Sequence, residues 1–174
     1  MPTVYRAGVD GIPQRLTGKP SWLITQLAMD TRRLVADGHA EVGAGPYQYR
    51  ILAALHEFGA SSQANLARRG NLDRSDVVGA INELVAQGFV ERTQDLDDRR
   101  RNVVSLTRAG TQRLRRIDQA LDKVQDQLLA PLSAADRQTL TRLLTRLLAH
   151  HRSNLGDQPP RIRESNGRDR RRRT

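Results

Sequence analysis

The sequence predicts a mainly α-helical fold with a small β-hairpin wing, arranged as a winged helix-turn-helix joined to a helical dimerisation region. Three observations lead to this prediction. Apolar residues recur at helical spacing over most of residues 21–153, and two short helical patterns meet at a tight turn in residues 70–72. Two β-rich strips then flank a tip of mixed charge between residues 89 and 106. Helix, turn, helix and charged hairpin, in that order, are the parts of a winged helix-turn-helix.

The composition limits the class of protein. At 174 residues the chain fits one domain with extensions, and its hydrophobic content of 37% is low. We therefore expect part of the core to be shared with a second subunit. The absence of Cys excludes disulfides and Cys–metal sites. No apolar run is long enough to span a membrane and the N-terminus lacks a signal-peptide pattern, so we expect a cytoplasmic, nucleoid-associated protein of bacterial type.

The charge indicates a polyanionic partner. The formal net charge is +10, and Lys19 and Lys123 are the only lysines, so nearly all basic residues are Arg. Arg binds phosphates and guanine edges with two hydrogen bonds at once, although a GC-rich genome would explain the ratio of Arg to Lys equally well. One Arg cluster lies within residues 92–116. A second lies in residues 154–174, which are predicted to form a disordered tail.

The N-terminal region is predicted to hold an arm and a helix. Residues 1–20 contain several Gly and Pro and predict an irregular arm with a short amphipathic piece near residues 14–16. Ser21 is expected to cap a helix that ends at about Asp37. We assign residues 21–45 as an N-terminal dimerisation helix and linker.

The winged helix-turn-helix is assigned to residues 46–106. Pro46 suits the first turn of its first helix. Ser61 or Ser62 is expected to cap the next helix, which ends at Gly70. The inner face of the first helix is predicted to carry Ile51, Leu52, Leu55 and Phe58.

The following helix is the expected recognition helix. Asp73 is predicted to cap it and Gly88 to end it. The wing strands are expected at residues 89–92 and 102–106. The apolar stripe of the helix is formed by Val77, Ile81, Leu84 and Val85, whereas Arg74, Ser75, Val78, Gly79 and Asn82 face outward.

Residues 107–153 are assigned as C-terminal dimerisation helices. Thr107 is expected to cap a long helix that Pro131 ends, and Ser133 to open the last helix. We interpret two apolar surfaces of these helices as contacts with a partner subunit. They are a coiled-coil-like seam at Leu114, Ile117, Leu121, Val124 and Leu128, and a leucine face at Leu140, Leu143, Leu144, Leu147 and Leu148.

Double-stranded DNA is the expected partner. The recognition helix can enter a major groove, and an Arg at the hairpin tip gains from the negative potential of a narrow minor groove. Taken alone, the charged tip would equally be a solvated loop; its place after a recognition helix favours DNA. The candidate DNA-binding residues are Ser62, Gln63, Arg74, Ser75, Val78, Asn82, Arg99, Arg100 and Arg101.

Over about residues 46–151 the chain resembles the MarR family of winged-helix transcription regulators. The resemblance is strongest in residues 72–75 (LDRS), 84–92 (LVAQGFVER), 97–100 (DDRR) and 104–110 (VSLTRAG). It implies a homodimer that binds a pseudo-palindromic operator and represses transcription until a small ligand releases it. It also implies that Arg100 enters the minor groove, where Asp98 and Asp73 steady the wing.

The chain departs from this family at two positions of the recognition helix. Members often carry Thr and then Arg where this chain has Val78 and Gly79, so a usual DNA contact is missing. Gly79 in the middle of a helix costs roughly 1 kcal/mol relative to Ala. A close approach of the helix backbone to DNA would explain the glycine, and so would an accident of packing.

The resemblance places effectors between the dimerisation helices and the winged domain. Near this junction the sequence offers one indole, two phenolic hydroxyls and two guanidinium groups, which suit a small aromatic or phenolic acid. These groups belong to Trp22, Tyr47, Tyr49, Arg15 and Arg50. The alternative is that Trp22 and Tyr49 are ordinary core residues and that Arg15 is solvated.

No metal, cofactor or catalytic site is expected. The four His residues have no ligand spacing, and neither a nucleophile elbow nor a phosphate loop is present. The favoured function is therefore a ligand-responsive dimeric repressor that is not an enzyme. The alternatives are a constitutive or architectural DNA-binding protein without an effector and, less favoured, an enzyme that acts on nucleic acid.

Overall fold

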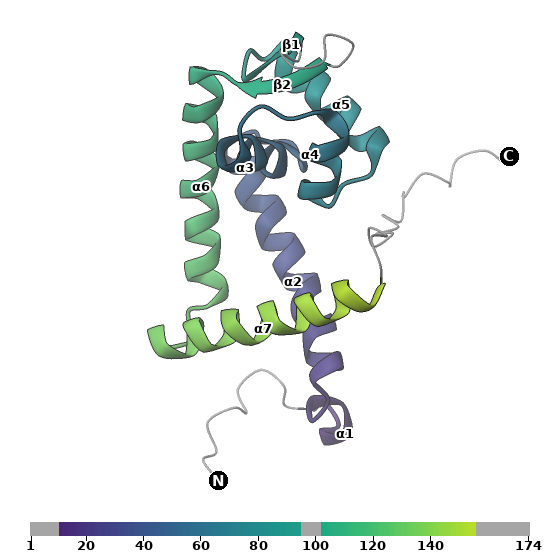
Figure 1. Ribbon diagram of the computed structural model, residues 1–174. Helices are drawn as coiled ribbons and strands as arrows, with labels where there is room; N and C mark the ends of the chain where they lie inside the picture. The colour runs from purple at the N-terminus through teal and green to yellow at the C-terminus, as the bar shows by residue number, and fades with distance from the viewer. Residues whose placement is uncertain (1–10, 95–101, 156–174) are drawn as a thin grey trace, which may run out of the picture.

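The computed structural model describes residues 11–94 and 102–155 (Figure 1). It is mainly helical with one two-stranded antiparallel hairpin, which confirms the predicted fold class. Several sequence predictions lie outside the described residues: the start of the N-terminal arm, nearly all of the C-terminal tail, and the wing tip with Asp98, Arg99, Arg100 and Arg101. Among the described residues, no helix has the length and apolar character needed to cross a bilayer.

The N-terminal helices differ from the prediction at their ends. The predicted arm contains one helical turn, α1 (Gln14–Thr17), and α2 (Pro20–Glu41) follows it. Lys19 is the N-cap, and Pro20 occupies the first turn, where its missing N–H breaks no helical hydrogen bond. Ser21 therefore lies inside the helix and does not cap it. The helix continues past Asp37 because packing of its buried end outweighs the low helix propensity of glycine.

The winged domain contains α3 (Gln48–Phe58), α4 (Gln63–Gly70), α5 (Arg74–Ala86), β1 (Val90–Gln94) and β2 (Asn102–Leu106). Its core is one apolar cluster, to which each of these five elements contributes buried side chains. The most deeply buried members are Ile51, Leu52, Leu66, Val77, Ile81, Leu84 and Val104. Phe58, predicted to be inside, is 50% exposed, and the Arg69 guanidinium lies 4.2 Å from its ring centroid instead.

The turns of the helix-turn-helix follow the prediction with one exception. Ser62 caps α4 by accepting a hydrogen bond from Asn65 N at 3.3 Å, and Asn71 turns the chain in the left-handed conformation with φ 52°. Asp73 is the N-cap residue of α5, but its side chain makes no capping hydrogen bond, so that prediction is wrong. Gly88, with φ 71°, follows α5 as the predicted stop.

The hairpin forms the root of the wing and is fixed to the rest of the domain. Val90 pairs with Leu106 and Gln94 with Asn102, so β1 begins one residue later and ends two residues later than predicted. Ser61 adds a short third strand segment, because it exchanges backbone hydrogen bonds with Val104 at 3.0 and 2.9 Å. The wing is thereby attached to the linker between α3 and α4.

The long helix α6 (Arg108–Leu128) packs inside its own protomer. Thr107 caps it, as predicted, by accepting from Gly110 N at 2.9 Å. The predicted seam faces α2 and α3: Ile117 is fully buried, and a Cβ on Gly38 would lie 2.7 Å from Val124 Cγ2. The seam is therefore an intramolecular contact. Its interpretation as a partner surface is wrong, since a heptad pattern shows that a face is apolar but not what covers it.

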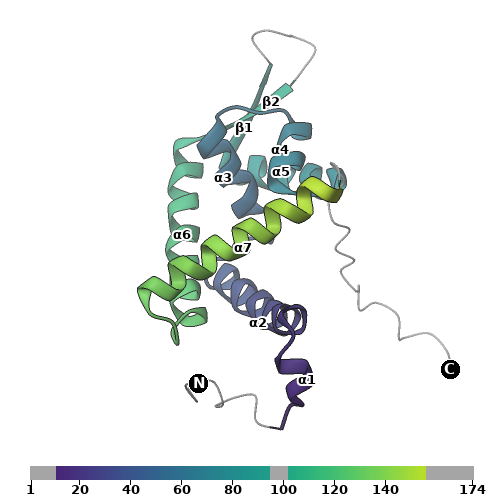
Figure 2. The same ribbon diagram turned by 60° about the horizontal axis from the view of Figure 1, so that its bottom comes forward.

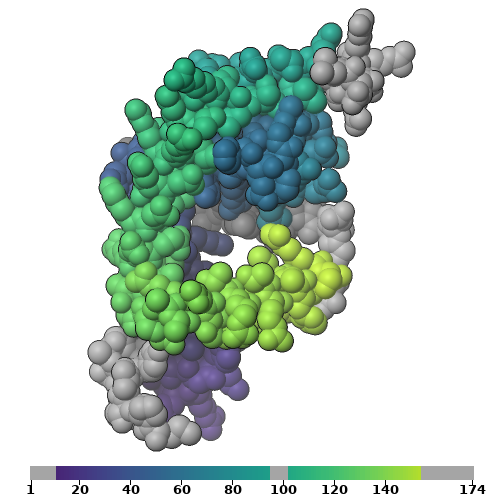
Figure 3. Space-filling model, turned by 60° about the vertical axis from the view of Figure 1, so that its left-hand side comes forward, coloured from purple at the N-terminus to yellow at the C-terminus, as the bar shows by residue number. Residues whose placement is uncertain are grey.

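The last helix, α7 (Ala134–Leu155), runs below the winged domain in Figure 1 and crosses in front of it in Figure 2. Ser133 opens it, because its hydroxyl accepts from Asp136 N and donates to Asp136 Oδ2. Figure 3 shows an opening between α7 and the winged domain. The leucine face of α7 is uncovered in the protomer, and so is an apolar face of α2. Their exposed members are Leu143, Leu144, Leu147 and Leu148 on α7 and Leu23, Ile24 and Leu27 on α2.

Candidate functional site

The recognition helix α5 presents the predicted outward face. Arg74, Ser75 and Asn82 are exposed, and the Val78 side chain is 43% exposed although it is apolar. Ala80 joins the predicted buried stripe, whereas Val85 is only half-buried. The orientation is fixed because the opposite face packs into the winged core, so these outward side chains have a defined direction.

Gly79 lies in the middle of this outward face. A Cβ built on it would meet none of the described atoms within 4 Å. Packing within the described protomer therefore gives no reason for glycine at this position. Both explanations that the sequence left open, a close approach to DNA and an accident of packing, remain predictions.

The start of α4 contributes less than predicted. Ser62 and Gln63 are half-buried, and the Ser62 hydroxyl already accepts the capping hydrogen bond from Asn65 N. Ser62 can still donate its hydroxyl proton. Asp73, predicted to support the wing, is exposed at the start of α5, and the wing residues it would contact lie beyond the described part.

Arg92 is a candidate that the sequence analysis did not select. It lies on β1, and its Nη2 donates to Asn82 Oδ1 at 2.6 Å. The recognition helix and the wing root are thus joined side chain to side chain at an exposed position. Sequence spacing gave no signal for this contact, because it depends on how α5 crosses the hairpin.

Arg113 forms a second connection that the sequence did not reveal. Its guanidinium donates to Val42 O and Gly43 O, both at 2.6 Å, and lies 3.4 Å from Gln48 Oε1. Gln48 in turn donates to Gln87 Oε1 at 3.2 Å, at the end of the recognition helix. Burial, and then the charge of Arg116, lowers the pKa of Arg113. This cluster links α6, the turn between α2 and α3, and α5.

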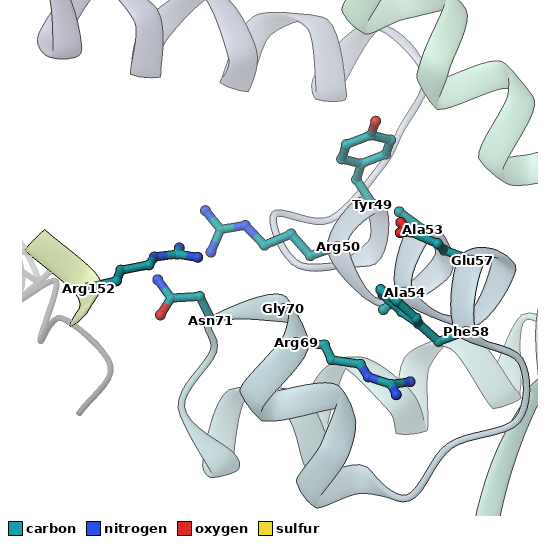
Figure 4. Close-up of a pocket in the computed structure, with 10 residues that line it drawn as sticks. All are labelled: Tyr49, Arg50, Ala53, Ala54, Glu57, Phe58, Arg69, Gly70, Asn71 and Arg152. Carbon is teal, nitrogen blue, oxygen red and sulfur yellow. The ribbon is translucent and has the colours of Figure 1, made fainter. Parts of the chain in front are cut away.

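A pocket of about 420 Å³ lies between the winged domain and the end of α7 (Figure 4). Two predicted effector residues, Tyr49 and Arg50, line it. The guanidinium groups of Arg50 and Arg152 extend toward one another across it, next to Asn71. Among the described residues, neither guanidinium forms a hydrogen bond or ion pair. The other lining residues are Ala53, Ala54, Glu57, Phe58, Arg69 and Gly70.

Tyr49 offers this pocket its ring rather than its hydroxyl. Burial raises the pKa of Tyr49, and the charge of Asp118 together with a hydrogen bond to it raises the pKa further. The hydroxyl is therefore directed to α6. On the same side, the His39 ring lies 6.4 Å from the Tyr49 ring, and burial, followed by the charge of Arg50, lowers the pKa of His39.

The remaining predicted effector residues are not brought together with Tyr49 in the protomer. Trp22 is half-buried near the start of α2, and Arg15 is in α1. Trp22 and His39 are separated by about 25 Å along the helix axis, at 1.5 Å per residue. Tyr47 packs against the winged core and does not line the pocket. The sequence placed all five residues near one junction because it could not supply the length and direction of α2.

Metal binding finds no support in the described residues, which contain no group of three or more His, Cys, Asp or Glu side chains placed to hold an ion. His150 and His151 contact each other, with ring centroids 5.3 Å apart.

The winged domain carries the decisive similarity. The sequence pattern of the MarR family matches residues 46–101. A crystal structure assigned as a transcriptional regulator from Pseudomonas aeruginosa is 34% identical, with a TM-score of 0.65, and the similarity covers 76% of this chain and 99% of that one. The chain belongs to the MarR family. The match to the family pattern includes α3, α4, the recognition helix and the start of the wing.

Two curated MarR-type relatives extend the comparison. A transcriptional regulatory protein assigned to the hcr operon of Thauera aromatica is 37% identical over 60% of this chain, and the match spans 63% of the length of that relative. The homoprotocatechuate degradative operon repressor of Escherichia coli is 29% identical over 64% of this chain and 76% of its own length.

Proposed function

We propose that this protein is a homodimeric repressor that binds a pseudo-palindromic DNA operator and is released by a small aromatic acid. The observation that carries the proposal is the outward face of α5, held rigidly beside the wing root on a chain of formal net charge +10. A helix exposed in this way can enter a major groove, and the surplus of Arg favours phosphate contacts. Membership of the MarR family supports the same function.

The uncovered leucines support the homodimer. Exposed apolar side chains lie on α2 and α7, two helices outside the winged domain (Figure 1). Several exposed large apolar side chains on one helix face are typical of an interaction site. A second copy offers the same surface, so a twofold contact would cover both sets at once and would set the spacing of two recognition helices.

The pocket between α3 and α7 supports an anionic effector. Arg50 and Arg152 bring two positive charges together without an acid between them, and a carboxylate would accept hydrogen bonds from both. The Tyr49 and Phe58 rings supply an apolar wall for an aromatic ring. Because α7 is part of the proposed dimer contact and α3 part of the winged domain, a ligand here would change how the two are spaced. One relative is named as the repressor of a homoprotocatechuate degradative operon, and an aromatic acid as effector of this chain is consistent with that name.

The test combines operator selection with ligand titration. Sequences bound by the full chain are selected from random DNA, and release from the selected operator is then followed while benzoate, phenylacetate and their hydroxylated forms are added. We expect release by at least one of these acids, and Arg50→Ala and Arg152→Ala should each weaken release without preventing operator binding. Arg146→Ala is the matched control, because Arg146 lies on α7 outside the pocket.

The possible outcomes separate the candidate functions. Operator binding that no acid in the panel reverses would leave a constitutive DNA-binding protein and would contradict the effector. Failure to select any motif would contradict the regulatory function as a whole. DNA cleavage in the presence of Mg²⁺ would favour the enzyme alternative.

A further inference from the structure

A hydrogen bond joins the recognition helix to the first wing strand. Arg92 Nη2 donates to Asn82 Oδ1 at 2.6 Å, and both residues are exposed. A guanidinium carries donors only, so the amide must present its oxygen to Arg92. The NH2 group of Asn82 is therefore directed away from Arg92. The contact fixes which end of the amide is available to another molecule.

Asn82 shares its face of α5 with Val78 and Gly79. Residues 78 and 82 are one turn apart, so their side chains are neighbours on the helix surface. Gly79 leaves open space next to them, because a Cβ there would touch nothing in the described structure within 4 Å. A base edge can therefore approach the helix closely at this point, and the exposed Asn82 amide lies three residues further along the same face.

The base that this amide can read depends on which atoms are free. An unrestrained Asn reads adenine by donating to N7 and accepting from the N6 amino group. In this chain the amide oxygen already accepts a charge-assisted hydrogen bond from Arg92, which occupies one of its two lone pairs and puts a positive charge beside the other, so a further N–H donor is disfavoured there. The NH2 group of Asn82 remains as a donor. Guanine presents two acceptors, N7 and O6, on its major-groove edge, and so fits this donor.

We propose that Arg92 is a specificity-determining residue that acts by positioning Asn82: it holds the Asn82 amide as a donor, so that this chain selects guanine over adenine at the base pair facing Asn82. The proposal rests on the DNA-binding function proposed above. Arg92, on the first wing strand, affects base selection only by orienting the Asn82 amide on the recognition helix. No direct contact between Arg92 and a base is required.

The test compares base preferences of four proteins: the wild type, Arg92→Ala, Asn82→Ala and the double variant. Each full-length protein selects binding sites from random DNA, and the position read by Asn82 is the one whose preference Asn82→Ala removes. We expect Arg92→Ala to lower the preference for guanine over adenine at that position by about tenfold, the value of one base-edge hydrogen-bond pattern. In the Asn82→Ala background, Arg92→Ala should change nothing further at this position, because its effect passes through the amide.

A matched control removes the same charge elsewhere. Arg115 is exposed on α6, and Arg115→Ala should leave the base preference unchanged. Three results would overturn the proposal: a wild-type preference for adenine at this position, an Arg92→Ala variant that binds all sequences more weakly with the same preference, or an Arg92→Ala effect that persists in the double variant. Absence of any selected motif for the wild type would contradict DNA recognition itself, which is a different failure.

Discussion

The winged domain and the helical extensions bury their apolar residues in different ways. In the winged domain, Ile51, Leu66, Ile81 and Leu84 have no exposed surface in a single chain. On α7, by contrast, Leu148 is 54% exposed, and neighbouring leucines are similar. The first region is complete as a monomer, while the second has an apolar face without a cover. The difference teaches that one chain buries the winged core by itself, whereas the leucines of α7 would be covered only in the proposed homodimer.

The largest expected effect is a loss of stability in the winged core. Ile81→Ala should reduce the free energy of unfolding by about 2–5 kcal/mol, because it leaves a cavity in a fully packed site. Urea denaturation followed by circular dichroism measures the loss. Since the cavity lies within one chain, the loss should be the same at every protein concentration. Val78→Ala, on the exposed face of the same helix, is the control and should change stability by less than about 0.5 kcal/mol.

The second prediction concerns the uncovered face. Leu144→Asp should convert the dimer to a monomer at micromolar concentration, because it places a charge in an apolar contact at a cost of several kcal/mol. Sedimentation equilibrium gives the mass. Gln138→Asp introduces the same charge on the opposite side of α7 and should leave the dimer intact. A Leu144→Asp protein that remains dimeric would place the interface elsewhere.

The third prediction tests the connection between the two regions. Arg113→Ala leaves the carbonyls of Val42 and Gly43 without their donor and should destabilise the protein by about 1.5–3 kcal/mol, the usual value of hydrogen bonds to a charged group. Thermal unfolding measures this change. Arg116→Ala, on the exposed side of the same helix, serves as the reference. Equal effects of the two variants would mean that the Arg113 contacts contribute nothing beyond charge.

Gly79→Ala should separate stability from function. The added methyl meets none of the atoms that the structure describes, so helix propensity should stabilise the winged domain by about 0.5–1 kcal/mol. The same methyl fills the space next to Asn82 and should weaken operator binding. A variant that is more stable and binds DNA as tightly as the wild type would show that the backbone does not closely approach a base.

The smallest expected effect is a pH dependence from His39. Its pKa in the folded protein lies below the ordinary 6.5, so the unfolded chain takes up a proton first as the pH falls. The His39 contribution to the free energy of unfolding should therefore be highest above about pH 6.5. It should decrease as the pH falls below this value, until the pH is also below the pKa of His39 in the folded protein. Denaturation at pH 7.5 and pH 5.5 measures the decrease, which His39→Gln should reduce. An identical decrease in the variant would assign it to other groups.

Local sequence signals predicted the helix-turn-helix and its turns. Ser62, Thr107, Ser133 and Gly88 lie where caps and stops were expected, because such signals depend on neighbouring residues only. The apolar stripe of α5 was likewise evident from its period. Each of these features is decided within about one helical turn of chain.

Contacts between distant segments could not be predicted in this way. The seam at Leu114–Leu128 has the same spacing whether α2 or a second chain covers it. Arg113 and Arg92 find partners more than nine residues away, at Val42 and Asn82 respectively. Trp22 was grouped with Tyr49 at one predicted effector junction, yet it lies near the start of α2, at the other end of that helix from the winged domain. The predicted DNA contacts of the recognition helix are correctly oriented and remain predictions, as do those of the wing tip.

The absence of a Cβ at Gly110 allows α6 to pack closely against the residue before β1. A Cβ at this position would overlap the carbonyl of Phe89, which is held by Thr107 through its backbone N–H at 3.1 Å and its hydroxyl at 3.0 Å. The obstacle is main chain, which cannot rotate aside as a side chain would. The backbone of the long helix therefore lies directly against the backbone of Phe89, the residue before β1, with no side chain between them. A rotation of α6 would therefore move the start of β1 with it, because no side chain between them can change its rotamer to absorb the displacement.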